Sequence, residues 1–415
     1  MPQRPNVILI MADDMGYGDI ATVNGGINTT PALDDLYHRS LRCSQGYAAS
    51  CVCAPSRAGF LTGRYPHRTG CTCLNDIHLL NQIALEEQTI ADVFAQGGYH
   101  TGLIGKWHCG HNGNYRPEHR GFQHVETYHP QTQDYWNWTI DENGSPRQAQ
   151  GEYLTDYLTD CTLRYIRQHQ HEPFFLHLAY YAPHRPLQAT EETLAHYLDR
   201  DELTEGQKRV YAMIESMDHG IGQIMNLLEE LDLDRNTIVI FTSDNGPDDY
   251  SQNDLSPSRS NMGLRGCKYS VHDGGIRVPM LVHWPDGMLT DRTTETLFHF
   301  VDFIPTLSAA CGIPLPRTLP LDGENRLPVW QGEEHKVQPV RFWQWNRHYP
   351  YPQCNAAMRD GDWKLLYPKL NGYNKMTQEN IEMILGKIPF ESSRPYPLEL
   401  GPPTSPMLFN LANDP

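Results

Sequence analysis

Acidic side chains follow two apolar segments that lie far apart in the sequence. Asp13 and Asp14 come directly after the run NVILIMA, and Asp244 and Asn245 follow the run TIVIFTS. Four oxygen-donor side chains at strand ends suit a hard divalent cation, calcium or magnesium. A single aspartate in such a place usually caps a helix or a turn. A pair at one strand end and an Asp-Asn-Gly at another favour a metal site.

Residues 51–64, CVCAPSRAGFLTGR, place two cysteines beside a proline, a serine and two arginines. The C-x-C pairs at 51/53 and 71/73 invite a zinc interpretation. Zinc ligands usually follow C-x2-C spacing with partners at set distances, and none is visible here. The chain has 10 cysteines in 415 residues. Apart from Cys53, they are expected to be mostly buried free thiols of a reducing compartment.

Several basic or titratable side chains lie near predicted strand ends, namely Arg57, Lys106, His108, His184 and Lys268. Singly, each is consistent with a solvated surface group or a structural histidine. Together they would form a local positive pocket in a chain whose formal net charge is −17. Such a pocket suits a small anion such as sulfate or phosphate. The overall charge disfavours nucleic acid and anionic membranes as partners.

The elements that must position these residues alternate along the chain. Apolar segments predict strands at 6–14, 100–108, 173–184, 237–246 and 278–285, and helical patterns cover 32–41, 89–96 and 205–231. This alternation predicts an α/β fold with a large, mainly parallel sheet sandwiched by helices. In such sheets the site forms at the carboxyl ends of the strands.

The pattern changes at about residue 325, where VRFWQWN and WKLLYP read as short antiparallel strands. We therefore predict an α/β domain over 1–325 and a small C-terminal α+β subdomain over 326–415, with a short antiparallel sheet. Residues 110–150 are expected to form an excursion over the surface. No apolar run reaches the length of a membrane span. The apolar N-terminal run ends in aspartates, as a strand does and a signal peptide does not. A cytoplasmic location is expected for the chain as written, and a periplasmic or secreted one if a signal peptide has been removed.

The segment CAPSRAGFLTGR resembles the signature of the type I sulfatases, the formylglycine-dependent, arylsulfatase-like branch of the alkaline phosphatase superfamily. Further family motifs are resembled by VILIMADDMGYGD, GLIGKWHCG, YYAPHRP, FTSDNG, GCKYSVHDGGIRVP and LFNLANDP, in family order over nearly the whole chain. The resemblance implies that 1–325 is the catalytic sulfatase domain. It also implies that Cys53, not Cys51, is converted to formylglycine by a maturation enzyme.

The same resemblance implies a set of metal ligands: Asp13, Asp14, Cys53 in its modified form, Asp244 and Asn245. The expected ion is Ca²⁺, with Mg²⁺ as the alternative. One hydroxyl of the formylglycine hydrate would attack sulfur.

The resemblance also implies roles for the basic residues. Arg57, Lys106 and Lys268 would offset the charge on the sulfuryl oxygens. His184 or Lys268 would protonate the leaving oxygen, and the resemblance leaves that choice open. His108 would deprotonate the second hydroxyl, which expels sulfate.

The expected substrate is a small-molecule or oligosaccharide sulfate ester, a sulfated carbohydrate or an aryl sulfate. Two alternatives remain: a phosphonate monoester or phosphodiester hydrolase with the same nucleophile, and a non-catalytic relative that binds sulfated glycans. Loops 110–150, 247–262 and 344–358 are predicted pocket walls. They carry Trp136, Trp138, Tyr250, Trp345, His348 and Tyr349, which suit either a sugar ring or ordinary packing. Two departures from the family stand out: Asp273, where relatives often carry Glu, and an end at Pro415, which leads us to expect a truncated or short C-terminal subdomain.

Overall fold

The computed structural model describes residues 4–74, 80–128, 134–249, 255, 257–315, 320–333, 338–347, 353–369 and 404–413. Within them, a sheet of 10 strands runs through the molecule in the order β11-β2-β10-β9-β1-β8-β4-β5-β6-β7. Its strands are β1 Asn6–Ala12, β2 Leu41–Cys43, β4 His100–Gly105, β5 His124–Tyr128, β6 Thr139–Glu142, β7 Ser145–Gln148, β8 Phe174–Ala179, β9 Thr237–Ser243, β10 Met280–His283 and β11 Arg292–Thr294. A separate pair joins β3 Gly46–Tyr47 and β12 Phe298–His299.

The centre of the large sheet is parallel. Strands β9, β1, β8, β4 and β5 run in one direction, whereas β10 is antiparallel to both β9 and β2. Strand β1 is buried along its whole length, as its continuous apolar sequence predicts for a strand covered on both faces. The five predicted strands and the mainly parallel α/β fold are confirmed.

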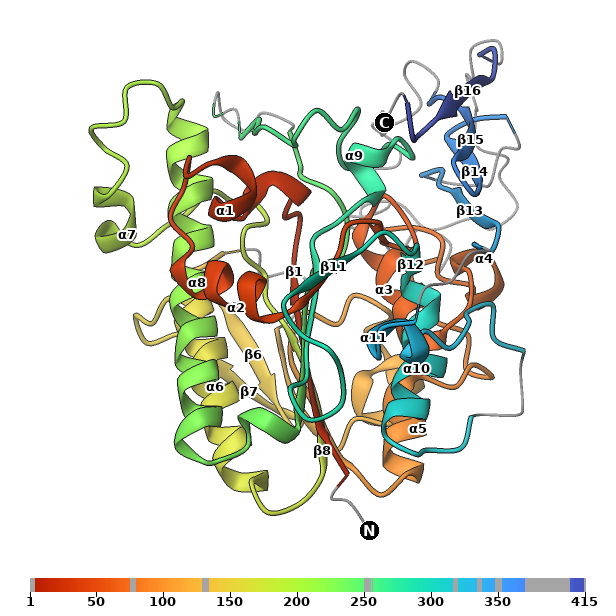
Figure 1. Cartoon of the computed structure of the whole chain (residues 1–415). Coiled ribbons are helices and arrows are strands. Elements are labelled where there is room, and N and C mark those ends of the chain that lie inside the picture. Colours follow the sequence, from red (N-terminus) through yellow and green to blue (C-terminus); the bar gives the residue numbers. More distant parts are fainter. Residues whose placement is uncertain are drawn as a thin grey trace, which may run out of the picture.

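Helices cover both faces of this sheet (Figure 1). On one face, α2 Pro31–Arg39, α6 Leu154–His169 and α8 Glu205–Glu230 pack against Ile8 and Ile10 of β1. On the other, α3 Cys53–Thr62, α5 Ile90–Gln96 and α10 Phe303–Ala310 pack against Val7 and Leu9. Alternate residues of one strand thus feed two cores, because successive side chains point to opposite faces. The predicted helices are confirmed. Shorter helical turns are α1 Ala21–Asn24, α4 Pro66–Thr69, α7 Glu191–Ala195, α9 Asp273–Ile276 and α11 Leu327–Trp330.

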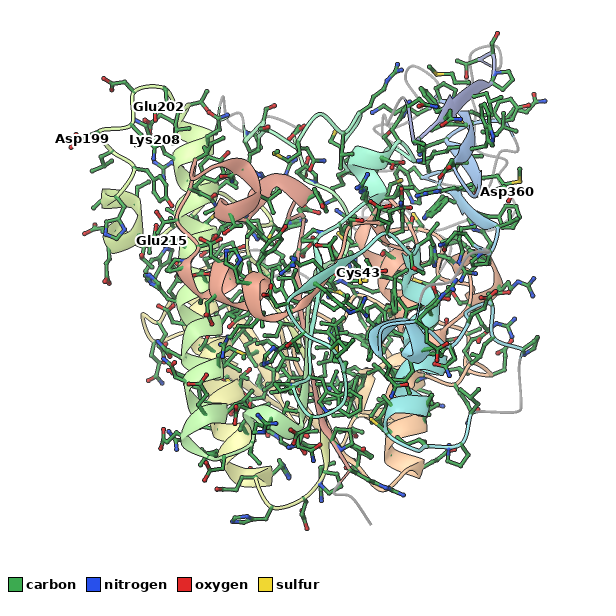
Figure 2. All side chains as sticks on the ribbon, in the orientation of Figure 1. Cys43, Asp199, Glu202, Lys208, Glu215 and Asp360 are labelled. Carbon is green, nitrogen blue, oxygen red and sulfur yellow. The ribbon has the colours of Figure 1, made fainter. Side chains whose placement is uncertain are left out.

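A second, antiparallel sheet lies at the C-terminal end of the chain, as predicted. It consists of β13 Arg341–Gln344, β14 Ala356–Asp360, β15 Trp363–Tyr367 and β16 Met407–Asn410. Its inner face is tied to the large domain: Trp343 Nε1 donates to the Ala48 carbonyl at 2.8 Å, and Lys364 pairs with Asp273. Asp273 therefore anchors this sheet. Asp360, by contrast, lies on its outer side (Figure 2). The boundary at residue 325 stays a prediction.

The expectation for residues 110–150 was incomplete. Strands β5, β6 and β7 lie in this stretch and extend the large sheet at one end, with β6 antiparallel to both neighbours. The stretch is polar because β7, at the edge, is largely exposed on both faces. Hydrogen bonds between strand backbones hold β7 in the sheet, and these bonds need no apolar pattern in the sequence.

All 10 cysteines are free thiols, and all except Cys267 are buried. Cys43, on β2, lies inside the molecule (Figure 2). The prediction of buried free thiols is confirmed. Among the described residues, no helix is long and apolar enough to cross a membrane.

Candidate active site

Cys53 is the first residue of helix α3, directly after the extended Val52. Every residue of this helix is buried, and Arg57 follows Cys53 by one turn, so both side chains lie on the same face. Cys53 Sγ is 3.4 Å from Asp13 Oδ1 and 3.9 Å from Asp14 Oδ1. Burial raises the pKa of the Cys53 thiol well above its usual range, and the charge of Asp13 adds to this. The unmodified side chain is therefore a neutral thiol and a poor nucleophile.

The acidic residues come from the carboxyl ends of β1 and β9. These neighbours are parallel and in register, with Ala12 opposite Ser243, so the residues that follow meet at one edge. Asp14 has φ +66°, in the left-handed region, and its backbone N–H donates to Asp244 Oδ1 at 3.2 Å. A non-glycine residue held in that conformation costs about 1–3 kcal/mol and is characteristic of functional sites.

These groups could hold a metal ion. One ligand atom from each of Asp13, Asp14, Cys53 and Asp244 lies within 4.8 Å of the others. Asn245 Nδ2 donates to Asp14 Oδ1 at 2.8 Å, while its buried Oδ1 has no hydrogen-bond partner among the residues that the structure describes. Three carboxylates and an amide oxygen fit calcium or magnesium. The Cys53 sulfur is the one soft donor of this set. Its replacement by oxygen would leave a set of hard oxygen donors alone.

Each carboxylate of the centre contacts its own cation. Lys106 Nζ binds Asp13, Lys268 Nζ lies 2.6 Å from Asp14 Oδ2, and Arg57 Nη2 lies 2.8 Å from Asp244 Oδ2. All six side chains are buried. Three negative and three positive charges balance, so a bound divalent cation would leave the centre positive. A buried centre of that charge attracts an anion.

The pKa values of the carboxyls differ with their surroundings. Burial raises the pKa of Asp14, but Lys268, His184 and Lys106 outweigh it and hold the pKa below its usual range. Burial, reinforced by the charge of Asp13, raises the pKa of Asp244 to about 6. Close carboxylates thus repel one another here, which a divalent cation would relieve.

Both predicted histidines lie in this region, each with one nitrogen held by a backbone carbonyl. His108 Nε2 lies 2.8 Å from the Leu74 oxygen, so it carries the proton. Within the described part of the chain, the buried Nδ1 has no hydrogen-bond partner. His184 Nδ1 lies 2.7 Å from the Arg185 oxygen, and its Nε2 is 3.6 Å from Asp14 Oδ2. Burial lowers the pKa of His108 well below its usual value and that of His184 to about 3, with Lys106 and Lys268 adding to the respective effects.

Three charged residues beside the centre were not predicted. Arg185 binds Asp248, which is 3.9 Å from Lys268 Nζ, and Arg259 Nη2 donates to the Asp14 carbonyl at 2.8 Å. Together they line a cavity of about 10 Å³ against Asp14, room for about one water molecule. Sequence position was the available signal: Arg185 follows His184 directly, and Asp248 comes shortly after Asp-Asn-Gly.

The predicted aromatic walls divide into two groups. Trp138 and Trp345 are each 1% exposed and belong to the packing of the protein, so they offer no open face to a ligand. The Trp345 ring packs against the ring of Tyr269, the residue after Lys268, with the centroids 5.5 Å apart. Trp136 is 36% exposed and stays a candidate wall. Tyr250, His348 and Tyr349 lie outside the described residues.

Comparison with known families agrees with this geometry. The family model "Sulfatase" matches residues 5–313, and the model "N-sulphoglucosamine sulphohydrolase, C-terminal" matches 267–380. The chain belongs to the sulfatase family, as its motifs suggested, and its named relatives are sulfatases, which hydrolyse sulfate esters.

Two human relatives illustrate the match. Arylsulfatase A of Homo sapiens is 33% identical over 396 residues, which cover 87% of this chain and 74% of the relative. N-acetylgalactosamine-6-sulfatase of Homo sapiens is 31% identical over 354 residues, covering 79% of this chain and 66% of the relative, just under two thirds. The cytoplasmic location expected from the sequence finds no support in these relatives.

Solved structures share the fold. The crystal structure of Ps i-CgsB in complex with k-i-k-neocarrahexaose superposes with a TM-score of 0.79 at 30% identity, covering 89% of this chain and 84% of that one.

Proposed function

We propose that this protein hydrolyses sulfate monoesters of carbohydrates, once Cys53 has been oxidised to formylglycine. One observation carries the proposal: Cys53, three carboxylates and three cations converge in a buried cluster at the carboxyl ends of β1 and β9. The hydrate of formylglycine offers two hydroxyls on one carbon, so one can attack sulfur and loss of a proton from the other can expel sulfate.

The metal ligands that we propose are Asp13, Asp14, Asp244, Asn245 and an oxygen of the modified Cys53. The oxygen-rich donor set supports Ca²⁺, with Mg²⁺ as the alternative, and so does Asn245 Oδ1, which no described side chain or backbone group hydrogen-bonds. A bound divalent cation would polarise the sulfate oxygens and lower the pKa of the attacking hydroxyl.

The three cations have two tasks in this proposal. Before substrate binds, Arg57, Lys106 and Lys268 neutralise the carboxylates that they contact. When a sulfate ester occupies the centre, their N–H groups stabilise the charge that develops on the sulfuryl oxygens. Because all three are buried, this stabilisation acts where water does not screen it.

Proton transfer falls to the remaining groups. We assign the base that deprotonates the second hydroxyl to His108, because its Nε2 proton is held by Leu74 and no described residue hydrogen-bonds to its Nδ1 lone pair. Lys268 and His184 are the two candidate acids for the leaving oxygen. Both contact Asp14, at 2.6 and 3.6 Å respectively, so both face the same side of the centre.

A carbohydrate is favoured as the leaving group. The Ps i-CgsB relative was crystallised with an oligosaccharide, and other relatives are named for an aminosugar sulfate. In this chain, the Arg185–Asp248 pair lies beside Lys268 and can exchange its mutual hydrogen bond for sugar hydroxyls.

Mass spectrometry and turnover test the proposal together. The tryptic peptide 43–57, from protein made in a host with formylglycine-generating activity, should carry an aldehyde at Cys53. That protein should release sulfate from 4-nitrophenyl sulfate and from N-acetylgalactosamine 6-sulfate. Cys53→Ala should release none, and Cys51→Ala, a change at a buried thiol two residues away, should retain turnover.

Each alternative has its own outcome. Faster hydrolysis of a 4-nitrophenyl phosphonate than of the sulfate would establish the phosphonate hydrolase. Binding of the sulfated sugar by fully matured protein without sulfate release would establish the non-catalytic relative. Turnover that survives Cys53→Ala would refute the nucleophile.

A further inference from the structure

Three metal-binding side chains meet at the edge of the sheet opposite the candidate active site. His100 is the first residue of β4, His169 is the last residue of α6, and Glu172 lies in the connection to β8. One ligand atom from each lies within 4.8 Å of the other two. The three side chains come from different elements, so the fold itself brings them together.

The contacts within this cluster are close. His100 Nε2 lies 2.7 Å from Glu172 Oε2, and the rings of His100 and His169 stack with their centroids 4.7 Å apart. The His169 ring also packs against the ring of Tyr165, with the centroids 4.5 Å apart. In the part of the chain that the structure describes, neither ring nitrogen of His169 has a hydrogen-bond partner.

Backbone hydrogen bonds hold the three positions in place. The His100 N–H donates to the Pro173 carbonyl at 3.0 Å, as an extension of the β4–β8 pairing. The Glu172 N–H donates to the His169 carbonyl at 3.2 Å, in the turn that closes α6. A ligand set on such anchors loses little chain entropy when it binds an ion.

The chemistry of this set differs from that of the catalytic cluster. Two imidazoles and one carboxylate are ligands of zinc, with a fourth position left for water. His100 and His169 are partly exposed and Glu172 is exposed, so an ion can reach all three side chains from solution.

We propose that His100, His169 and Glu172 form a second metal site, selective for Zn²⁺. The ion takes the place of the direct contact between His100 and Glu172, and it joins the end of α6 to the starts of β4 and β8. Strand β4 runs for 6 residues between this site and Lys106, a span of roughly 20 Å. Zinc here stabilises the fold and leaves turnover unchanged.

Equilibrium dialysis against ZnCl₂ tests the site, with the protein kept in excess Ca²⁺ to occupy the catalytic cluster. Wild type should retain one more zinc per chain than His169→Ala. In Glu172→Gln the affinity for that zinc should fall by about tenfold or more. His38→Ala, which removes an exposed histidine of α2, serves as the matched control and should behave as wild type. Equal zinc content in wild type and in both site variants would overturn the proposal.

Thermal unfolding supplies a second readout. Zinc should raise the unfolding temperature of wild type and of His38→Ala, because a ligand that binds only the folded state stabilises it. The same zinc should leave His169→Ala unshifted. Because Glu172 is exposed, Glu172→Gln should fold normally. If His169→Ala does not fold, the comparison of wild type with Glu172→Gln still tests the site. An equal shift in all four proteins would place the zinc elsewhere.

Discussion

Replacing Arg57 with lysine keeps the positive charge of the centre and removes the planar group that joins its parts. Arg57 Nε and Nη2 lie 2.9 and 2.8 Å from Asp244 Oδ2, and Nη1 donates to the Lys106 carbonyl at 3.1 Å. A lysine ammonium is a point charge on a flexible stem and cannot reproduce this fork. Breaking a buried pair costs about 3–5 kcal/mol. Since Arg57→Lys retains the charge, we expect a loss in unfolding free energy of about 3 kcal/mol, at the lower end of that range.

The same variant should lose turnover for a separate reason. Removing one donor that stabilises developing charge costs about 10²–10³ in kcat. We expect a loss of that size with 4-nitrophenyl sulfate under saturating calcium. Arg57 also belongs to the maturation motif, so kcat must be divided by the formylglycine content measured by mass spectrometry. Arg39→Lys, on the partly exposed face of α2, is the control. Unchanged kcat per formylglycine, together with unchanged urea unfolding, would refute the geometry argued for Arg57.

Three further predictions follow from the same contacts. Asp13→Asn should lose calcium binding in calorimetry and turnover together; calcium binding equal to that of wild type would exclude Asp13 as a ligand. Gly105→Ala should fail to give folded protein by circular dichroism, because Gly105 has φ +104° and a Cβ would lie 1.9 Å from the Ala179 oxygen. The control Gly25→Ala, at φ +79° with open space around the position, should fold with a loss of about 1 kcal/mol in unfolding free energy. Because the folded state raises the pKa of Asp244 from 3.8 to about 6, it binds the proton more tightly than the unfolded chain, so stability in EDTA should fall as the pH rises from 4 to 6. Asp244→Asn should lack that part of the slope, and identical slopes would contradict the assignment.

Much of the site could be inferred from local sequence. The strand of residues 6–12 is apolar throughout and ends in two aspartates, and in a parallel sheet this places the acids at the active edge. The motif around Cys53 predicts the position of the proposed nucleophile, because its residue types occur in a short fixed order. Helices α5 and α8 were predictable for the same reason, because capping residues and apolar periodicity depend only on residues close together in the sequence.

Other features lay beyond local patterns. The sequence left open whether Trp138 and Trp345 are pocket walls or packing residues, because an aromatic residue suits either environment until its neighbours are known. The structure buries both in the packing of the protein. Strands β5 to β7 read as a surface excursion because their pairing depends on the backbone. The Arg185–Asp248 contact joins residues 63 positions apart, and the cluster of His100, His169 and Glu172 joins three elements.

The sequence by itself determined the alternation of strands and helices, the residue types of the centre and the edge of the sheet where they gather. Only the tertiary structure decided which cation neutralises which carboxylate. Lys268 reaches Asp14 across 254 positions and Arg57 reaches Asp244 across 187, and those pairings depend on strand order and register. The physical reason is range. Propensity and periodicity act between residues a few positions apart, whereas the charge balance of a buried site is set by groups that only the packed sheet brings within hydrogen-bonding distance.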